Sequence, residues 1–492
     1  MEENPNQDPS VTADVDATST TTTNLNDLSQ DILLHILSFL PTLESITTSL
    51  ISKKWKSLWS LVPSLNFSYV HFPIYKSFFT TRQFFSEFVD RTLILRPHLP
   101  LQKFRLEFIY EDRYSCHVDS WVRYAIRNRV SELDLDFFID ESFHIVESEG
   151  RRDYDFPFSA LRNGKVRVLK LCRCDLTLPA DMESMNLWSM KEIFFYQIYM
   201  TDDMVLNLLK ACPNIEVLKL ENCYGMENLR LCSEKLKRLG LSSFYTAERE
   251  LYLELDCPNL VWLSIDCVET GEFCIKNLSS LIEFRTSIVH KTEHYVHWFK
   301  VVKQLHRIAH IKHLVVQNWW RKVWIVLRVT GEMDYLKVEE GLRILFPSLL
   351  RNVEISRTGK FFAKDGISKD FLLHNLKHLE LQTGYTQYDL LGMAALLELC
   401  PNLETMILDP LYKIDDDESL SEELLNKPIH FSIPSLKEVK LKVIPGENQN
   451  QIVQFVALLK KQGVVLDKIV LVPLYSGISV SRRRPLRAEV NE

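Results

Sequence analysis

Glycine is scarce in this chain. It accounts for 14 of the 492 residues, against a usual share of about 7%. The closest two glycines, Gly359 and Gly366, are seven positions apart. This spacing excludes the dinucleotide-binding pattern GxGxxG, the phosphate-binding loop GxxxxGK and the GxSxG turn of hydrolases. The sequence therefore lacks the usual signatures of nucleotide-binding proteins and of α/β-hydrolases.

Long apolar runs and a secretory signal are also missing. No run approaches the roughly 18–20 apolar residues that a membrane helix needs, and the first 24 residues are polar. We therefore expect no membrane partner and a reducing compartment, which means the cytoplasm, the nucleus or both.

The ten cysteines do not suggest a disulfide framework. They contain no CxxC pair, and the closest two, Cys172 and Cys174, are separated by one residue. Cys212, Cys257 and Cys400 each precede Pro-Asn. We interpret these three as small buried hydrophobic side chains at equivalent places in a repeat.

Basic residues are absent from the first 52 positions, which hold eight acidic residues. The whole chain has a net charge of −7, so the rest of it is almost neutral. A nucleic-acid partner would require a net basic domain, and we expect none. Residues 1–24 have few large apolar side chains and are predicted to form a disordered polar leader.

Three short helices are predicted in residues 25–65. Asp27 can cap the first, Pro41 ends it, Thr42 opens the second and Ser52 caps the third. Their large apolar side chains are Ile32, Leu33, Ile36, Leu37, Leu40, Leu43, Ile46, Leu50, Trp55, Leu58 and Trp59. A unit of this size cannot bury so much apolar surface by itself, so we expect it to bind a partner.

Beyond a poorly patterned link at 66–100, the pattern apolar-x-x-apolar-x-apolar recurs about every 28 residues. Each copy is predicted to be a short strand with one buried face. In four copies a proline stands two residues before the pattern, and a helix-like segment precedes that proline. This order predicts a helix, which the proline ends, followed by a strand. The copies start at Leu101, Val130, Val166, Met190, Ile215, Leu236, Leu260, Leu281, Ile311, Leu350, Leu376, Leu403, Leu436 and Leu466.

Three parts of the sequence resemble a known family. Residues 27–41 (DLSQDILLHILSFLP) and 51–59 (ISKKWKSLW) are similar to a plant F-box, although the family signature begins Leu-Pro and Leu28 is followed here by Ser29. The repeats resemble the irregular leucine-rich repeats of plant F-box proteins. The segment from Pro434 to Leu471 resembles the FBD region found at the C-terminus of such proteins.

The resemblance implies an α/β architecture, in which a small three-helix F-box precedes a leucine-rich-repeat solenoid. Short strands would line the concave face, with helices and loops outside. The expected division is a polar leader (1–24), the F-box (25–65), a link (66–100), the solenoid (101–427), FBD-like terminal repeats (428–474) and a basic tail (475–492).

The function implied by this resemblance is that of a substrate-recognition subunit of an SCF-type (Skp1–cullin–F-box) E3 ubiquitin ligase. Such a subunit is not an enzyme and needs no cofactor; it positions an unknown protein target near enzymes carried by other subunits. A Skp1-type adaptor, and through it a cullin, would be its partners. Two alternatives stay open: an F-box scaffold that acts with the adaptor outside a ligase, and a small-ligand, hormone-like sensing receptor. The residues that the resemblance assigns to adaptor binding are Leu28, Ile32, Leu33, Ile36, Leu37, Leu40, Pro41, Ser52, Lys53, Trp55, Leu58 and Trp59.

A cluster of aromatic and basic residues is the candidate for target binding. Trp319, Trp320, Arg321 and Trp324 follow a predicted strand, and Trp and Arg are favoured anchors of protein interfaces. Packing of these rings in the core is the alternative interpretation.

Histidine spacing invites a metal hypothesis, which the sequence does not support. Two triplets have i, i+4, i+7 spacing, but neither has a neighbouring cysteine or an HExxH context, so no metal site is predicted. The triplets are His290, His294 and His297, and His306, His310 and His313.

Overall fold

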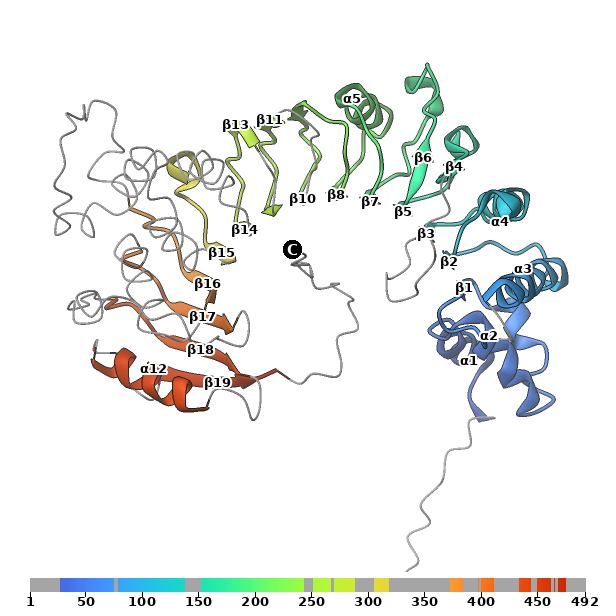
Figure 1. The fold of residues 1–492 in the computed structure, drawn as a ribbon, viewed down its shortest axis with the longest axis horizontal. Helices are drawn as coiled ribbons and strands as arrows, with labels where there is room; N and C mark the ends of the chain where they lie inside the picture. Colours follow the sequence, from blue (N-terminus) through green and yellow to red (C-terminus); the bar gives the residue numbers. More distant parts are fainter. Residues whose placement is uncertain are drawn as a thin grey trace, which may run out of the picture.

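One curved sheet organises the protein in this computed structural model. The described residues are 27–74, 78–137, 152–242, 251–266, 270–287, 305–317, 372–383, 397, 400–410, 433–443, 449–461, 464 and 468–474. Within them, a 14-stranded parallel sheet runs in the order β1-β2-β3-β5-β7-β8-β10-β12-β14-β15-β16-β17-β18-β19. Its strands line the inside of an arc, with helices α1 and α2 at one end (Figure 1). In this part of the chain, no helix has both the length and the hydrophobicity to cross a membrane.

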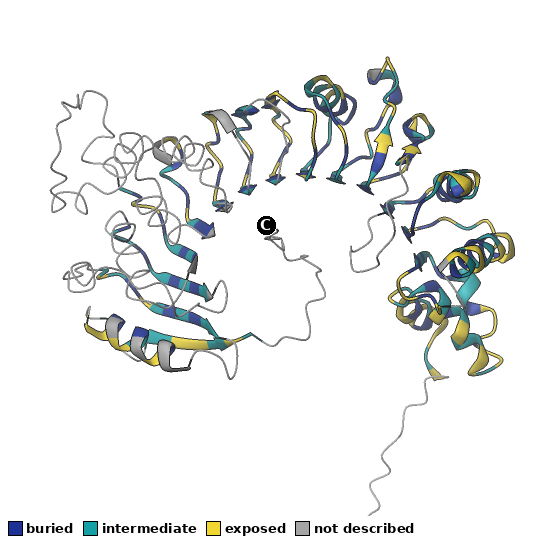
Figure 2. Cartoon of the chain, viewed as in Figure 1, coloured by how far each residue is buried: buried dark blue, intermediate teal, exposed yellow. Residues whose placement is uncertain are grey.

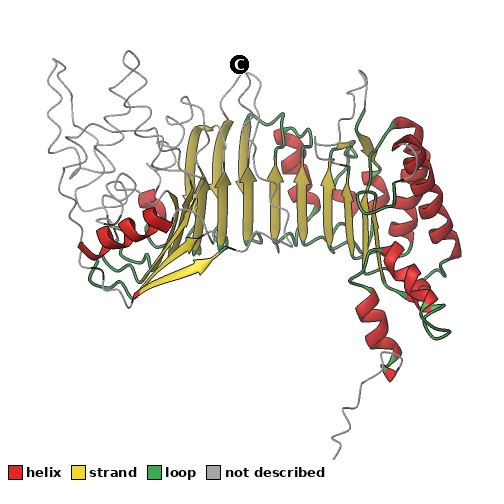
Figure 3. Ribbon diagram, turned by 60° about the horizontal axis from the view of Figure 1, so that its bottom comes forward, coloured by secondary structure: helices red, strands yellow, loops and turns green. Residues whose placement is uncertain are grey.

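The strands of the main sheet are short and stand side by side (Figure 3). They are β1 (Ser64–Ser68), β2 (Lys103–Glu107), β3 (Glu132–Asp136), β5 (Val168–Cys172), β7 (Glu192–Tyr196), β8 (Val217–Glu221), β10 (Arg238–Ser242), β12 (Trp262–Asp266), β14 (Glu283–Ser287), β15 (His313–Gln317), β16 (His378–Thr383), β17 (Thr405–Pro410), β18 (Glu438–Val443) and β19 (Ile469–Pro473).

The outside of the arc carries the helices and two small sheets (Figure 1). The helices are α1 (Gln30–Leu37), α2 (Thr42–Thr47), α3 (Phe78–Leu95), α4 (Ser115–Arg127), α5 (Asp202–Ala211) and α12 (Gln449–Lys461). The short 3₁₀ helices are η2 (Thr48–Leu50), η3 (Leu58–Leu61), η4 (Asp112–Tyr114), η5 (Phe158–Leu161), η6 (Glu183–Met185) and η7 (Leu305–Ile308). The small sheets join β4 (Tyr154–Phe156) to β6 (Cys174–Leu176), and β9 (Asn228–Cys232) to β11 (Leu251–Asp256) and β13 (Thr270–Asn277).

The strands lie where the repeat pattern predicts them. The copy that starts at Ile215, for example, gives β8, which begins two residues later at Val217. Leu218 and Leu220 point into the core and are fully buried, whereas their neighbours are not. Figure 2 colours the strands of the arc by burial, and buried residues recur along them. This alternation follows from the two-residue period of a strand. The predicted solenoid with a concave strand face is confirmed, while the copies at Leu350 and Leu466 lie outside the described residues.

The segment 66–100, which we expected to be a link, is part of the solenoid. It contains the end of β1, which pairs in parallel with β2, and the 18-residue helix α3. Val62, Leu65 and Phe67 do match the repeat pattern, and all three are buried. The sheet therefore begins within residues 25–65, the range that the resemblance assigns to the F-box.

The F-box helices begin and end differently from the prediction in two places. Ser29, not Asp27, caps α1, and its hydroxyl accepts a hydrogen bond of 3.4 Å from the Ile32 amide. The third predicted helix is instead a run of turns that ends in η3. Its amides bond to carbonyls three residues back, as from Leu58 to Trp55 at 3.2 Å. A three-residue turn aligns Trp55 with Leu58 rather than with Trp59.

The three cysteines before Pro-Asn occupy equivalent positions, as expected. Each is buried, and the carbonyl of each accepts a hydrogen bond from the amide three residues later. Burial raises the pKa of Cys212 and Cys400 to about 12 and that of Cys257 to about 11. They act as hydrophobic side chains at the turn that precedes a strand.

The C-terminal repeats form strand, helix and strand in the predicted order. Strand β18 pairs in parallel with β19, and α12 connects them on the outside of the arc (Figure 1). The predicted helix over 453–459 lies within α12.

Candidate partner-binding surfaces

The F-box has a small core of its own. Leu33, Leu37, Trp55, Leu58 and Val62 form it, and only 3% of Trp55 is exposed. Four of these residues were assigned to adaptor binding by resemblance. The structure places their side chains inside, where they hold the F-box together and present no contact surface.

The other assigned residues lie nearer the surface. Ile32 and Ile36 are exposed on α1, and Lys53 is exposed on the following turns. Leu28, Leu40, Pro41, Ser52 and Trp59 are half-buried. The resemblance missed three strongly exposed apolar side chains: Phe39 (72%), Leu50 (83%) and Ile51 (61%).

Ile32 and Ile36 lie on one side of α1, because they are four residues apart, and Phe39 is exposed in the turn that follows the helix. Leu33 and Leu37 point to the core from the other side. The division within α1 follows from helical spacing, and continuing that spacing to position 39 could have identified Phe39.

Hydrogen bonds attach the F-box to the start of the solenoid. The Asn66 amide of β1 donates to the Thr42 hydroxyl of α2 at 2.8 Å. Leu43 of α2 packs against the main solenoid core. These contacts set the orientation of the F-box relative to the concave face.

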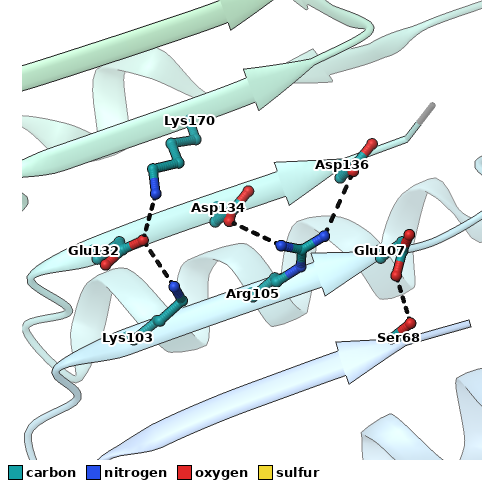
Figure 4. Close-up of polar contacts among 8 residues, drawn as sticks. All are labelled: Ser68, Lys103, Arg105, Glu107, Glu132, Asp134, Asp136 and Lys170. Atoms are coloured by element: carbon teal, nitrogen blue, oxygen red, sulfur yellow. Dashed lines mark hydrogen bonds and ion pairs between the residues drawn. The ribbon is translucent and has the colours of Figure 1, made fainter. Parts of the chain in front are cut away.

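The concave face at β2, β3 and β5 is covered by paired charges (Figure 4). The Glu132 carboxylate accepts hydrogen bonds from Lys103 at 2.9 Å and Lys170 at 2.8 Å. Burial opposes ionisation of Glu132, but these two bonds hold its pKa below the ordinary value.

Arg105 lies between two carboxylates on the neighbouring strand, with nitrogen–oxygen distances of 3.7 Å to both Asp134 and Asp136. Burial raises the pKa of Asp134, and the charge of Arg105 opposes this effect. Beside this pair, Ser68 of β1 donates a hydrogen bond to Glu107 of β2 (Figure 4). The charges in this part of the face are therefore largely satisfied within the chain.

Two glutamates, Glu216 and Glu404, each bind a pair of lysines where the strands begin, and we call these two groups the glutamate clamps. Glu216 accepts from Lys191 and, at 2.8 Å, from Lys237. Glu404 binds Lys377 at 2.7 Å and Lys437 at 2.5 Å. In each case these bonds lower the carboxyl pKa to about 2.

Two aromatic side chains, Phe194 and Trp262, interrupt the charges in the middle of the concave face. The Phe194 ring has the Lys170 and Lys219 ammonium groups 5.4 Å from its centre. Trp262 has the Arg238 guanidinium at 4.8 Å and the Lys219 ammonium at 5.4 Å. No motif in the sequence predicts a role for these two residues. The signal present in the sequence is a Trp or Phe at a strand position expected to face away from the core.

The described histidines do not form a metal centre. His310 contacts the Leu278 carbonyl at 3.1 Å, whereas His313 stacks on His378 with ring centres 4.4 Å apart. Burial and the neighbouring His378 lower the pKa of His313. Within the described residues, no three His, Cys, Asp or Glu side chains converge to hold a metal.

Several candidates lie outside the described residues. These are the first histidine triplet and the target-binding candidates Trp319, Trp320, Arg321 and Trp324. The role of the three tryptophans and Arg321 in target binding stays a prediction.

Comparison with known proteins gives matches to two domains. The F-box domain model matches residues 25–67. The family model described as "At1g61320/AtMIF1, LRR domain" matches residues 94–323. The F-box match ends near the first strand, and the repeat match begins at the end of α3.

Three curated proteins of Arabidopsis thaliana illustrate the similarity. F-box/LRR-repeat protein At3g59200 is 31% identical over 267 residues, covering 53% of this chain and 48% of the relative. F-box/FBD/LRR-repeat protein At2g04230 is 28% identical over 347 residues, covering 64% and 74%. FBD-associated F-box protein At1g66310 is 31% identical over 270 residues, covering 52% and 55%. The chain thus spans about half the length of the first and third of these relatives. The chain thus contains an F-box domain followed by a leucine-rich-repeat domain, and it is similar to F-box/LRR-repeat and F-box/FBD/LRR-repeat proteins of Arabidopsis thaliana.

Proposed function

We propose that this protein is the substrate-recognition subunit of an SCF-type E3 ubiquitin ligase. F-box domains generally bind Skp1-type adaptors, and leucine-rich repeats generally bind protein targets. In this role the chain binds the adaptor through its F-box and a protein target through its repeats, in the cytoplasm or the nucleus. It contributes proximity and orientation to ubiquitin transfer, and the bond chemistry belongs to other subunits.

The exposed apolar surface at α1 is the observation that carries this proposal. Ile32 and Ile36 are exposed on the helix and Phe39 in the turn that follows it, although the F-box has a complete core of its own. Apolar side chains gathered on a surface mark a protein contact. Leu50 and Ile51, exposed at the end of η2, add apolar surface to the same domain.

The attachment of the F-box supports the same role. Thr42 and Asn66 join α2 to β1 at 2.8 Å, and the concave face curves away from this end of the arc (Figure 1). A target on that face would be held in a defined orientation relative to the adaptor. Such positioning is what a recognition subunit adds to the rate of ubiquitin transfer.

Co-expression of the full chain with a Skp1-type adaptor and a cullin tests the proposal. We expect both to co-purify with the wild-type chain. Phe39→Ser, combined with Ile36→Ser, should weaken adaptor binding at least ~30-fold, because loss of an interface anchor costs about 2 kcal/mol or more. The matched control is Ile94→Ser, since Ile94 is 80% exposed on α3 and lies outside the F-box.

Either of two results would contradict this assignment. One is a folded wild-type chain that binds no Skp1-type adaptor. The other is a loss of binding in the Ile94 control equal to that in the double variant. Adaptor binding without cullin would favour the scaffold alternative.

A further inference from the structure

The middle of the concave face is built around a glycine. Lys219 of β8 pairs in register with Gly240 of β10, and Arg238 of β10 pairs with Trp262 of β12. A Cβ atom at Gly240 would lie 3.1 Å from Cγ of Lys219 and 3.5 Å from Cζ3 of Trp262. The indole of Trp262 therefore reaches back over Gly240, into space that a larger side chain would fill.

The Trp262 ring is held in this position from both ends. Its Nε1 donates a hydrogen bond to Glu283 of β14 at 3.2 Å. The Arg238 guanidinium lies 4.8 Å from the ring centre, and the Lys219 ammonium lies 5.4 Å from it. An aromatic ring with a fixed orientation loses little entropy when a ligand covers it.

Basic and aromatic side chains lie next to one another across five neighbouring strands. Lys170 and Lys219 stand on the two strands beside Phe194, and Lys219 and Arg238 both approach the ring of Trp262. We call Lys170, Phe194, Lys219, Trp262 and Arg238 the aromatic–basic row. Because the strands are parallel and in register, residues far apart in the sequence become neighbours at about 4.8 Å per strand.

Arg238 differs from the arginine nearer the F-box on the same face. Arg105 is held between two aspartates. Arg238 is exposed, and no carboxylate in the described residues pairs with it. A guanidinium that lies on an indole and keeps its donors available can bind a carboxylate through two parallel hydrogen bonds.

We propose that the aromatic–basic row binds an acidic peptide segment of the target, with a carboxylate on Arg238 and an adjacent apolar side chain on Trp262. This inference rests on the proposed function and names the chemistry of its target. The row offers both a cation for the acid and ring surface for the apolar group. Arg and Trp are also the side chains that most often anchor interfaces.

The surrounding charges favour a short acidic peptide over a nucleic acid. Acidic side chains stand on the same strands as the row and would repel a repeated phosphate backbone. They are Glu192, Glu221, Asp266 and Glu283. A polyanion would require a face with a large excess of basic residues.

Selection from two synthetic peptide libraries tests this inference on the full chain. The first library fixes Asp or Glu beside a varied aliphatic or aromatic position. The second is identical except that Asn or Gln replaces the acid. We expect retention of the acidic library only, and selection of apolar residues next to the acid.

Fluorescence anisotropy with the most enriched acidic peptide then measures each variant. Arg238→Glu and Trp262→Ala should each weaken binding at least tenfold. Gly240→Leu should do the same, because its side chain displaces the indole. Arg127→Glu is the matched control, since Arg127 is exposed on α4 outside the arc, and it should leave binding unchanged.

Equal retention of both libraries, or of neither, would overturn the inference. So would an equal loss of binding in the Arg127 and Arg238 variants, or stronger competition from a single-stranded oligonucleotide than from the peptide. Adaptor binding is measured in parallel and should be normal in all four variants. If wild-type chain selects acidic peptides but binds no adaptor, the ligase role fails and the peptide site stands.

Discussion

Arg96 donates a hydrogen bond of 2.7 Å from Nη2 to the carbonyl oxygen of Val62, and so joins the end of α3 to the point where the F-box passes into β1. Only 3% of Arg96 is exposed. A second bond of 3.4 Å reaches the Leu99 carbonyl. One buried guanidinium thus links three segments that the sequence analysis had divided between the F-box and a link.

Replacing Arg96 with Leu should lower the free energy of unfolding by about 1–3 kcal/mol, because the buried Val62 carbonyl loses its partner. Urea unfolding followed by circular dichroism measures the change. Arg91→Leu on the exposed side of α3 is the control and should change stability by less than about 0.5 kcal/mol. Equal stability of the two variants would show that the Arg96 bond does not support the junction.

Trp55→Ala should unfold the F-box, because it removes a core side chain and not a surface contact. The side chain is 3% exposed in the core with Leu33 and Leu58, and its loss costs about 3–5 kcal/mol. Hydrogen exchange of the α1 amides should show loss of protection in this variant. Leu50→Ser, at a side chain that is 83% exposed, should keep that protection. Retained protection in Trp55→Ala would mean that this ring is not part of the core.

Gly225→Ala should lower the free energy of unfolding by about 1–3 kcal/mol. Gly225 has φ +98, and an added Cβ would lie 2.5 Å from Cε2 of Tyr199 and 2.9 Å from the Met200 carbonyl oxygen. A second change, Tyr199→Ala, removes the ring but neither the backbone strain nor the carbonyl contact, so it should not restore stability. Asn222→Gly is the control. Asn222 already adopts φ 53, which glycine adopts without strain, so this change should not lower the free energy of unfolding in the same way. Thermal unfolding that gives Gly225→Ala a wild-type midpoint would refute this account of the turn.

Acid should destabilise the solenoid through the two glutamate clamps. The pKa values of Glu216 and Glu404 are lowered to about 2 by hydrogen bonds from their lysines, below the value of about 4.3 for an unfolded chain. Their contribution is therefore complete above the unfolded value and is lost as the pH falls toward about 2. The thermal midpoint of the wild type should fall more steeply between about pH 5 and 2 than that of a Glu216→Gln, Glu404→Gln double variant.

Salt provides a control for the clamps. Because these carboxylates are near the surface, high ionic strength should reduce the difference between the wild type and the double variant at neutral pH. If the thermal midpoints of the two proteins fall equally steeply as the pH is lowered, the clamps contribute nothing to stability.

The repeat pattern was enough to place the strands. A triplet such as Ile215, Leu218 and Leu220 specifies a buried face by local spacing alone, and β8 lies where it predicts. The same reasoning overlooked β1, although Val62, Leu65 and Phe67 have the spacing of the repeat. Val62 and Leu65 lie in the predicted F-box and Phe67 in the predicted link, so the boundary between these two segments divided the strand.

Backbone geometry decides which side chains of the F-box are buried in its core and which lie at its surface. Trp55 and Trp59 would share one side of an α-helix, but the turns between them repeat every three residues. Trp55 therefore packs with Leu58 in the core, and Trp59 stays half-buried at the surface. Resemblance to a family motif identified the segment and could not separate its core residues from its surface.

The amino-acid sequence by itself determined which residues form strands and which of their side chains face the core, because burial with a period of two is a local property. Only the tertiary structure decided which outward residues meet. Arg238 and Trp262 are 24 positions apart, and they become neighbours because β10 and β12 pair in register. Gly240 and Lys219 complete the site through the same pairing. Register depends on the lengths of the loops and on packing of the whole solenoid, and no single repeat specifies it.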